Sequence, residues 1–362
     1  MNLPHLEIIP RHTPSRLAFF AVPVLTIGLT ILASLGLFTL MGKAPGTVLY
    51  SFFIDPLIGS YNLSEVLLKA GPLILIAQGL AIGFRARVWN IGAEGQFTIG
   101  AICAALVPIT WAGHDSRWML VAMILVGAAA GAAWGGIAAL LRTRFNASEI
   151  IVTLMLNQVA LQLLNYLING PLKDPRGFSF PQSIQFADGA MYPSLFESGV
   201  LRANASIFLV VIASVAAWVY VRHSFSGFRL LVGGLAPNAA RYAGFSANRA
   251  IWISLLVGGM AAGLAGVGEI SGPIGKLQPI LSPGYGFAAI IVAFLGALNP
   301  FGIVLAGLFM AIIYVGADGA VLSAGIPASA PVVFQGLILI FYLASYTLVN
   351  FRIRIRSVAG VR

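Results

Sequence analysis

Residues 118–141 read WMLVAMILVGAAAGAAWGGIAALL and contain no charged side chain. A helix of about 20 apolar residues is long enough to cross the hydrocarbon core of a membrane. Basic residues bound this run, with Arg117 directly before it and Arg142 directly after it. An uncharged run of this length between charged ends is typical of a transmembrane helix, and this stretch therefore decides the fold class.

The whole chain has the same character. Of its 362 residues, 59% are hydrophobic and 9% are charged, whereas about 25% are charged in an ordinary soluble domain. The 41 glycines suit helices whose backbones approach closely in lipid. Long apolar runs, in place of short alternating segments, argue against an outer-membrane β-barrel. We therefore predict an all-α, polytopic membrane protein.

Ten apolar runs have about the length of a membrane span. They lie near 17–40, 64–84, 88–111, 118–141, 150–168, 205–221, 251–270, 284–298, 301–318 and 332–350. The eighth is short, and Asn299-Pro300 separates it from the ninth. With both termini in the cytoplasm, 14 of the 21 Lys and Arg residues lie inside and 7 lie outside, as the positive-inside rule requires. The same rule explains the net charge of +10 without nucleic acid.

We predict a single transmembrane domain over residues 1–362. It begins with a cytoplasmic segment, 1–16, and has two long loops. Residues 169–204 form an outer loop that is large enough to meet a soluble partner, and residues 222–250 form a basic cytoplasmic loop. The first apolar run is too long for a cleavable signal peptide.

The sequence contains no catalytic constellation. It has no Walker-type glycine-rich loop, so the chain is not expected to hydrolyse nucleotide by itself. The four histidines, His5, His12, His114 and His223, lie in terminal segments or loops and lack metal-ligand spacing. A single cysteine, Cys103, excludes a disulfide within the chain. We predict neither an enzyme nor a metal or cofactor site in this chain.

One polar cluster lies inside the third apolar run. Asn90 and Glu94 are four residues apart and share a helix face, Gln96 follows, and Gly92 and Gly95 weaken the helix between them. Intramembrane polar groups are costly and mark functional candidates. The cluster favours a broken helix that lines a translocation path. The alternative is that Glu94 pairs with Arg85 or Arg87 and only fixes helix packing.

A second polar group lies in the fifth run. Gln158, Gln162 and Asn165 recur at i, i+4 and i+7, so they form one stripe on a helix. We expect the stripe to face the helix bundle and not lipid. Neutral amides suit hydroxyls and heterocycle edges, which favours an uncharged polar solute. Interhelical hydrogen bonding is the alternative role.

The cytoplasmic loop contains a short helix candidate, Pro237-Asn238-Ala239-Ala240-Arg241-Tyr242-Ala243-Gly244. Pro237 suits the first helical position, because the N–H that it lacks has no intrahelical partner there. Gly244 suits the residue after the end. Two turns of helix are not stable alone in water, so a docking partner is expected. The alternative is a capped turn on an ordinary loop.

Several stretches, in one order along 64–345, together resemble the inner-membrane permease subunits of bacterial ABC importers, in the branch that includes ribose and branched-chain amino-acid permeases. The chain looks most like the nucleoside permeases of that branch. The resemblance is carried by Phe84-Arg85-Ala86 with Asn90–Gln96, by residues 146–157 and 169–175, by Ala239–Gly244, by Gly284-Tyr285-Gly286-Phe287, by Leu298-Asn299-Pro300, by Gly325-Ile326-Pro327 and by Val333–Gly336.

The resemblance implies a set of partners. Such permeases pair with a second permease chain, here expected to be a paralogue. Each docks a cytoplasmic ATP-binding subunit, which holds the ATP and Mg, through a coupling helix. A periplasmic or lipoprotein binding protein delivers the substrate. Carried onto this sequence, residues Pro237 to Gly244 would be the coupling helix, with Arg241 and Tyr242 as its contacts. The family usually has Asn before the proline, whereas Ala236 stands here and offers no side-chain cap.

The resulting hypothesis is an ATP-driven importer permease of a bacterial inner membrane whose solute is a nucleoside. A sugar such as ribose is the alternative within the family, since sugars share most of these features. An alternative from another class is an ion-gradient-driven secondary transporter with Glu94 as the ion site. A secondary transporter needs no docking helix, so the cytoplasmic loop discriminates between the two.

Overall fold

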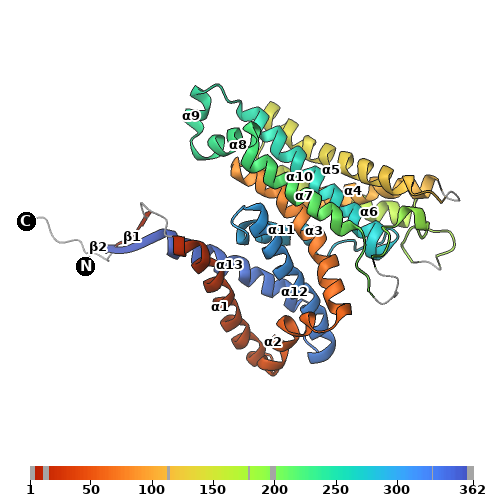
Figure 1. Cartoon of the computed structure of the whole chain (residues 1–362), viewed down its shortest axis with the longest axis horizontal. Helices are drawn as coiled ribbons and strands as arrows, with labels where there is room; N and C mark the ends of the chain where they lie inside the picture. Colours follow the sequence, from red (N-terminus) through yellow and green to blue (C-terminus); the bar gives the residue numbers. More distant parts are fainter. Residues whose placement is uncertain are drawn as a thin grey trace, which may run out of the picture. The chain divides into compact units, whose positions relative to one another are not determined.

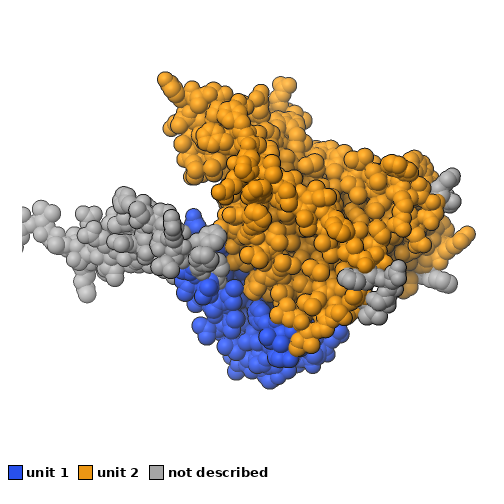
Figure 2. All heavy atoms as spheres, viewed as in Figure 1, with its two compact units in different colours: residues 1–55, 316–362 blue, residues 56–315 orange. Residues whose placement is uncertain are grey.

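The computed structural model describes residues 5–10, 16–111, 115–177, 180–195, 201–327 and 329–356. His12 and His114 lie outside these ranges, as do Arg11 and Arg362 among the basic residues used for the orientation. The chain forms two compact units (Figure 2). Unit 1 comprises residues 1–55 and 316–362, and unit 2 comprises residues 56–315.

Each predicted span corresponds to a helix. These helices are α1 (Arg16–Leu40), α3 (Ser60–Arg85), α4 (Ala93–Thr110), α5 (Trp118–Phe145), α6 (Glu149–Asn169), α7 (Ser206–His223), α10 (Ala247–Glu269), α11 (Tyr285–Leu295), α12 (Pro300–Ala324) and α13 (Ala330–Asn350). Among the described residues, seven helices have the length and hydropathy of a membrane span. The prediction of a polytopic helical membrane protein is confirmed.

The helix at the eighth predicted span is too short to cross a membrane. It was expected over 284–298, but α11 has 11 residues and is therefore about 17 Å long, against a hydrocarbon core of about 30 Å. Ala297 and Leu298 follow it with φ of 52° and 56°, which ends the helix. Hydropathy alone could not show this, because the apolar residues run on past the last helical turn.

In the described ranges, three further α-helices lie outside the predicted spans. They are α2 (Pro45–Phe53), α8 (Phe225–Leu235) and α9 (Pro237–Tyr242). Both α8 and α9 lie within the predicted cytoplasmic loop. Figure 1 places them at one end of the unit 2 helices, opposite the loop that joins α6 to α7.

The core of unit 2 is a close packing of α3, α4, α5 and α10. Glycines make it possible, because a Cβ on Gly131 would collide with the backbone of Gly259, and one on Gly127 with the side chain of Val267. Gly263 likewise faces the backbone of Gly127. Small residues let helix backbones approach in a membrane, which is the use that the glycine-rich composition predicted.

The loop between α6 and α7, which was predicted to lie outside, packs on the segment that follows α10. Ser183 N–H donates to the Leu277 carbonyl over 3.0 Å, and Leu277 N–H donates to the Ser183 hydroxyl over 2.9 Å. Lys276 Nζ donates to Gln182 Oε1 over 2.8 Å. α10 ends in one π-helical turn, Ile270–Ile274, whose Ser271 carbonyl accepts from Tyr192 N–H.

Unit 1 contains α1, α2, α13 and the end of α12, and α1 packs against α13. Two short strands were not foreseen by the all-α prediction: β1 (His5–Pro10) and β2 (Phe351–Arg356) pair antiparallel, with His5 opposite Arg356. The sequence of β2 alternates apolar and basic residues, which is a strand pattern. The pairing brings residues 5–10 and 351–356 side by side.

Candidate functional site

The connection between α3 and α4 is not helical, although Val88, Asn90 and Gly92 within it are buried. Asn90 Nδ2 donates to Gln96 Oε1 over 2.9 Å, and Gln96 Nε2 donates back to Asn90 Oδ1 over 3.3 Å. The same Asn90 oxygen accepts from Gly92 N–H over 2.9 Å. Asn90 and Gln96 are 3% and 1% exposed. The two amide side chains therefore satisfy one another's hydrogen-bonding groups, and Asn90 also binds the backbone N–H of Gly92 in the non-helical connection.

α6 completes this closed cluster. Asn157 Oδ1 accepts from Gly95 N–H over 2.8 Å, and Asn157 Nδ2 donates to the Ile91 carbonyl over 2.9 Å. The Thr153 hydroxyl accepts from Ile91 N–H over 3.2 Å. A Cβ on Gly95 would lie 2.9 Å from Asn157 Cα. The glycine is needed for the close approach of α6, and its amide is the group that α6 binds.

Glu94 points to a different element. Its Oε2 accepts from Gly286 N–H over 2.6 Å, and the residue is 5% exposed. Gly286 is in the first turn of α11, where amide groups lack intrahelical partners. A carboxylate there also complements the positive end of the helix dipole. The alternative that Glu94 pairs with Arg85 or Arg87 is wrong, because its partner is the backbone of α11.

Arg85 holds the other end of α11. Its Nε and Nη2 donate to the Leu298 carbonyl over 3.2 and 2.8 Å. Leu298 lies three residues beyond the end of α11, where the dipole is negative and a cation is favourable. The half-length helix is therefore bracketed by Glu94 at its start and Arg85 at its end. Both partners come from the stretch that contains the break between α3 and α4.

The polar stripe of α6 lies about 100° around the helix from Asn157. Gln158, Gln162 and Asn165 are all exposed, whereas Asn157 is 1% exposed and Leu164 is also buried. The prediction of one shared helix face holds, since all three lie within α6. The expected orientation toward this chain's own bundle is not observed. The amides face outward from a helix that has the composition of a membrane span.

The stretch from Pro237 to Gly244 forms the predicted short helix. Pro237 is at the start of α9, and Ala236 provides no side-chain cap. Gly244 has a φ of 78°, and its N–H donates to the Arg241 carbonyl over 3.0 Å. Phe245 N–H donates to the Ala240 carbonyl over 2.9 Å, which completes a Schellman cap. α9 is thus capped at its C-terminal end and has no side-chain cap at its N-terminal end.

α9 has one face turned to the protein and one turned outward. Ala240 is 4% exposed, whereas Tyr242 is 97% exposed, and Arg241 is also exposed. The preceding helix is anchored firmly, because Gly234 of α8 lies directly against the Arg85 carbonyl. The two side chains that were predicted to make a contact are therefore presented on a fixed support.

Sequence reasoning missed four members of these sites. Thr153 and Asn157 were available as a polar pair at i, i+4, on the other face of α6 from the glutamines. Gly286 and Leu298 act through backbone atoms, which leave no signal in the residue types. Within the described ranges, no group of three or more His, Cys, Asp or Glu side chains is placed to hold a metal ion.

Comparisons with known proteins bear on what this architecture does. The family described as "Branched-chain amino acid transport system / permease component" matches residues 62–343. The glucose ABC transporter permease protein TsgB13 of Haloferax volcanii is 35% identical over 98% of this chain and 95% of its own length. The guanosine ABC transporter permease protein NupP of Bacillus subtilis is 30% identical over 92% of this chain and 95% of its own length.

Relatives also occur as two permease proteins in one organism. The nucleoside ABC transporter permease protein NupB of Lactococcus lactis is 28% identical over 90% of this chain and 91% of its own length. The same bacterium has a second similar permease, NupC, and Bacillus subtilis has NupQ beside NupP.

Proposed function

The chain belongs to the permease-component family of branched-chain amino acid transport systems, the membrane subunits of ABC transporters, and on this premise we propose that it imports a nucleoside across the inner membrane. A separate ATP-binding subunit would hold and hydrolyse ATP with Mg. A periplasmic or lipoprotein binding protein would deliver the solute to the outer loop. The second permease chain would be a paralogue, as the paired permease proteins of two relatives suggest.

The observation that carries this proposal is the outward-facing stripe of Gln158, Gln162 and Asn165. Amides on a membrane span are costly if they face lipid, so this face of α6 needs a polar neighbour. A second permease chain packed there, with the solute passing between the two, would supply one. Amide oxygens and N–H groups match sugar hydroxyls and the donor and acceptor edges of a base, which together describe a nucleoside.

Asn90, Glu94 and Gln96 remain predicted path residues, in a supporting position. Asn90 and Gln96 bond to one another, Asn90 also accepts from Gly92 N–H, and Glu94 accepts from Gly286 N–H of α11. A solute could reach the Glu94 carboxylate only if α11 moved away from it. In the proposed importer Glu94 therefore acts on the path through the placement of α11, and Asn90 and Gln96 act through the conformation of the connection before α4. The α6 stripe makes the direct contacts.

α9 fits the role of a coupling helix. Its exposed Arg241 and Tyr242 offer a charge and an amphipathic ring to an ATP-binding subunit. A conformational change driven by ATP requires a contact that differs between two states of the permease. The firm seat of α8 against the end of α3 would carry motion of α9 to Arg85, and through Arg85 to the end of α11.

A sugar is the second candidate solute. The name of TsgB13 assigns glucose to that protein, and a sugar presents the same hydroxyls to the amide stripe. Uptake by the complete transporter separates the two candidates: labelled guanosine or adenosine should enter, and excess ribose or glucose should not compete. Competition by a sugar at equal concentration would replace nucleoside by sugar. Uptake that follows a proton gradient at constant ATP would replace both with a secondary transporter.

The coupling role is tested by charge reversal. Arg241→Glu should abolish ATP-driven uptake while the protein stays inserted at the normal level, because the docking contact would become repulsive. Arg222→Glu is the matched control, since Arg222 is an exposed arginine at the end of α7. Normal uptake by Arg241→Glu, or equal loss in the control, would contradict the coupling assignment.

A further inference from the structure

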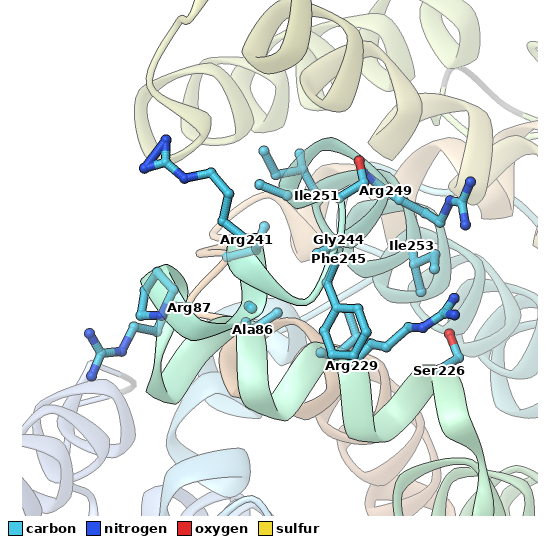
Figure 3. A pocket seen from close by; sticks show the side chains of 18 of the residues that line it. Ala86, Arg87, Ser226, Arg229, Arg241, Gly244, Phe245, Arg249, Ile251 and Ile253 are labelled. Atoms are coloured by element: carbon cyan, nitrogen blue, oxygen red, sulfur yellow. The ribbon is translucent and has the colours of Figure 1, made fainter.

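A cavity of about 530 Å³ lies behind α9, between α8, α9 and the start of α10 (Figure 3). The ends of α3 and α5 and the first residue of α6 also contribute to its wall. Among its lining residues are five arginines, namely Arg87, Arg142, Arg229, Arg241 and Arg249, and one carboxylate, Glu149. The transport cycle proposed above assigns no role to this space.

The cavity carries an excess of positive charge. Glu149 pairs with Arg142 over 3.2 Å, so the single carboxylate is already neutralised. In the described part of the chain, none of the other four arginines forms an ion pair. Walls of low dielectric focus the field of like charges into a cleft. An anion is therefore the kind of ligand that this space favours.

Arg229 is the most constrained of these cations. It lies on α8, and its guanidinium carbon is 4.1 Å from the centroid of the Phe225 ring and 5.3 Å from that of Phe245. Its buried Nε has no hydrogen-bond partner among the described residues. Buried donors are nearly always paired, so this guanidinium is held by aromatic rings with a donor still to be satisfied.

Arg249 accompanies Arg229. In Figure 3 the two side chains extend to the same side of the view, while Arg87 and Arg241 extend to the other. The side chain of Ser226 lies beside Arg229 in the same view, and its hydroxyl is 2.9 Å from the Tyr220 hydroxyl. Two guanidinium groups and a hydroxyl provide donors of the kind that bind phosphate oxygens.

We propose that this cavity binds a phosphate group, with Arg229 and Arg249 as its principal ligands. The phosphate could come from an anionic lipid headgroup or from a soluble phosphorylated molecule. The surroundings favour the lipid, because Phe225, Phe228 and Leu235 of α8 are 59%, 52% and 69% exposed. A helix with exposed aromatic and aliphatic side chains next to arginines suits the membrane interface. The cytoplasmic leaflet supplies anionic headgroups there.

The proposed site is connected to α9 through Phe245. This residue contacts Arg229, and its N–H closes the end of α9 through the Ala240 carbonyl. A bound phosphate would fix Arg229 and, through the stacked ring, the end of α9. Phosphate binding would therefore stabilise the conformation in which α9 is presented. The inference depends on the proposed function only for this consequence, not for the binding itself.

Binding is measured on the purified full chain, without its transport partners. Native mass spectrometry would count phosphatidylglycerol retained from mixed micelles with phosphatidylcholine, and calorimetry would measure soluble glycerol phosphate. We expect Arg229→Gln with Arg249→Gln to weaken binding of the phosphate probe roughly tenfold or more, because both charge-assisted contacts are lost. Arg144→Gln with Arg222→Gln is the matched control: it removes the same charge from exposed sites that do not line the cavity.

The Arg229→Lys, Arg249→Lys pair provides a variant that keeps both charges and guards against misfolding. It should melt like the wild type and bind with intermediate affinity, because an ammonium lacks the guanidinium fork. Retention of phosphatidylglycerol alone identifies the lipid as the source, and binding of glycerol phosphate alone identifies a soluble ligand. The proposal is overturned if neither probe binds, or if the control pair loses as much binding as the cavity pair. If neither probe binds and the Gln pair fails to assemble with the ATP-binding subunit, the cavity is a contact for that protein and not a phosphate site.

Discussion

Asn157 and Gln158 are neighbours in α6 with similar amide side chains, yet one lies on its buried face and the other on its exposed face. Asn157 is 1% exposed and bonds to the backbone of Gly95 in α4 and of Ile91 in the connection before it. Gln158 is exposed and starts the stripe that continues to Gln162 and Asn165. One residue is about 100° of rotation around a helix. The closed cluster and the open stripe thus differ in helix face and not in chemistry.

The closed cluster exists because the backbone between α3 and α4 is not helical. Unsatisfied N–H and C=O groups cost several kcal/mol each in lipid, and the connection from α3 to α4 and the half-length α11 both expose such groups. Asn90, Asn157, Glu94 and Arg85 supply the missing partners. The exposed amides of the stripe do not supply partners to such backbone groups in the described part of the chain. Polar side chains without a partner in their own chain are the ones available for a solute or a second chain.

The largest effect on stability is expected at Asn157, with its neighbour Gln158 as the comparison. Asn157→Leu would leave Gly95 N–H and the Ile91 carbonyl without partners, at a cost of roughly 1–3 kcal/mol each. We expect a strongly lowered yield of folded protein and a lower melting temperature in detergent. Gln158→Leu, one position away, should melt like the wild type. Equal destabilisation by both substitutions would show that the two faces of α6 are not distinct.

A smaller effect is expected at Glu94. Glu94→Ala removes the acceptor for Gly286 N–H and should lower stability by roughly 1–3 kcal/mol, whereas Glu94→Gln retains an oxygen and should lose less. Melting temperatures should therefore fall in the order wild type, Gln, Ala. Uptake by Glu94→Gln should keep its KM, since the carboxylate positions α11. A changed KM with unchanged stability would move Glu94 to the solute path.

The smallest effect on stability is expected within the stripe, where a substitution should change transport and not folding. Gln162→Leu should leave the melting temperature unchanged and raise the KM for the solute about fivefold, the equivalent of roughly 1 kcal/mol for one hydrogen bond. Val159→Leu, at an exposed apolar position of α6, is the control and should leave KM unchanged. A Gln162→Leu protein with normal uptake would remove the stripe from the path.

Much of the architecture could be predicted because its signals are local. The ten apolar runs correspond to ten helices, and α9 lies where Pro237 and Gly244 predicted it. The end of α11 could not be predicted, because it depends on two residues with positive φ, Ala297 and Leu298. The partner of Glu94 could not be predicted either, because it is the backbone of a residue 192 positions away. The nearby Arg85 and Arg87 were the more obvious choice in sequence.

The sequence by itself determined the membrane location, the helix periodicity and the short helix in the loop between α7 and α10. These follow from hydropathy over about 20 residues, from the 3.6-residue turn and from the backbone preferences of proline and glycine. Only the tertiary structure decided which polar groups are closed and which are open. That choice depends on which face of α6 meets α4, and on backbone groups of Ile91, Gly95 and Gly286 whose partners come from distant segments. Residue types along a chain record the supply of hydrogen-bonding groups, and packing decides which of them remain free to act.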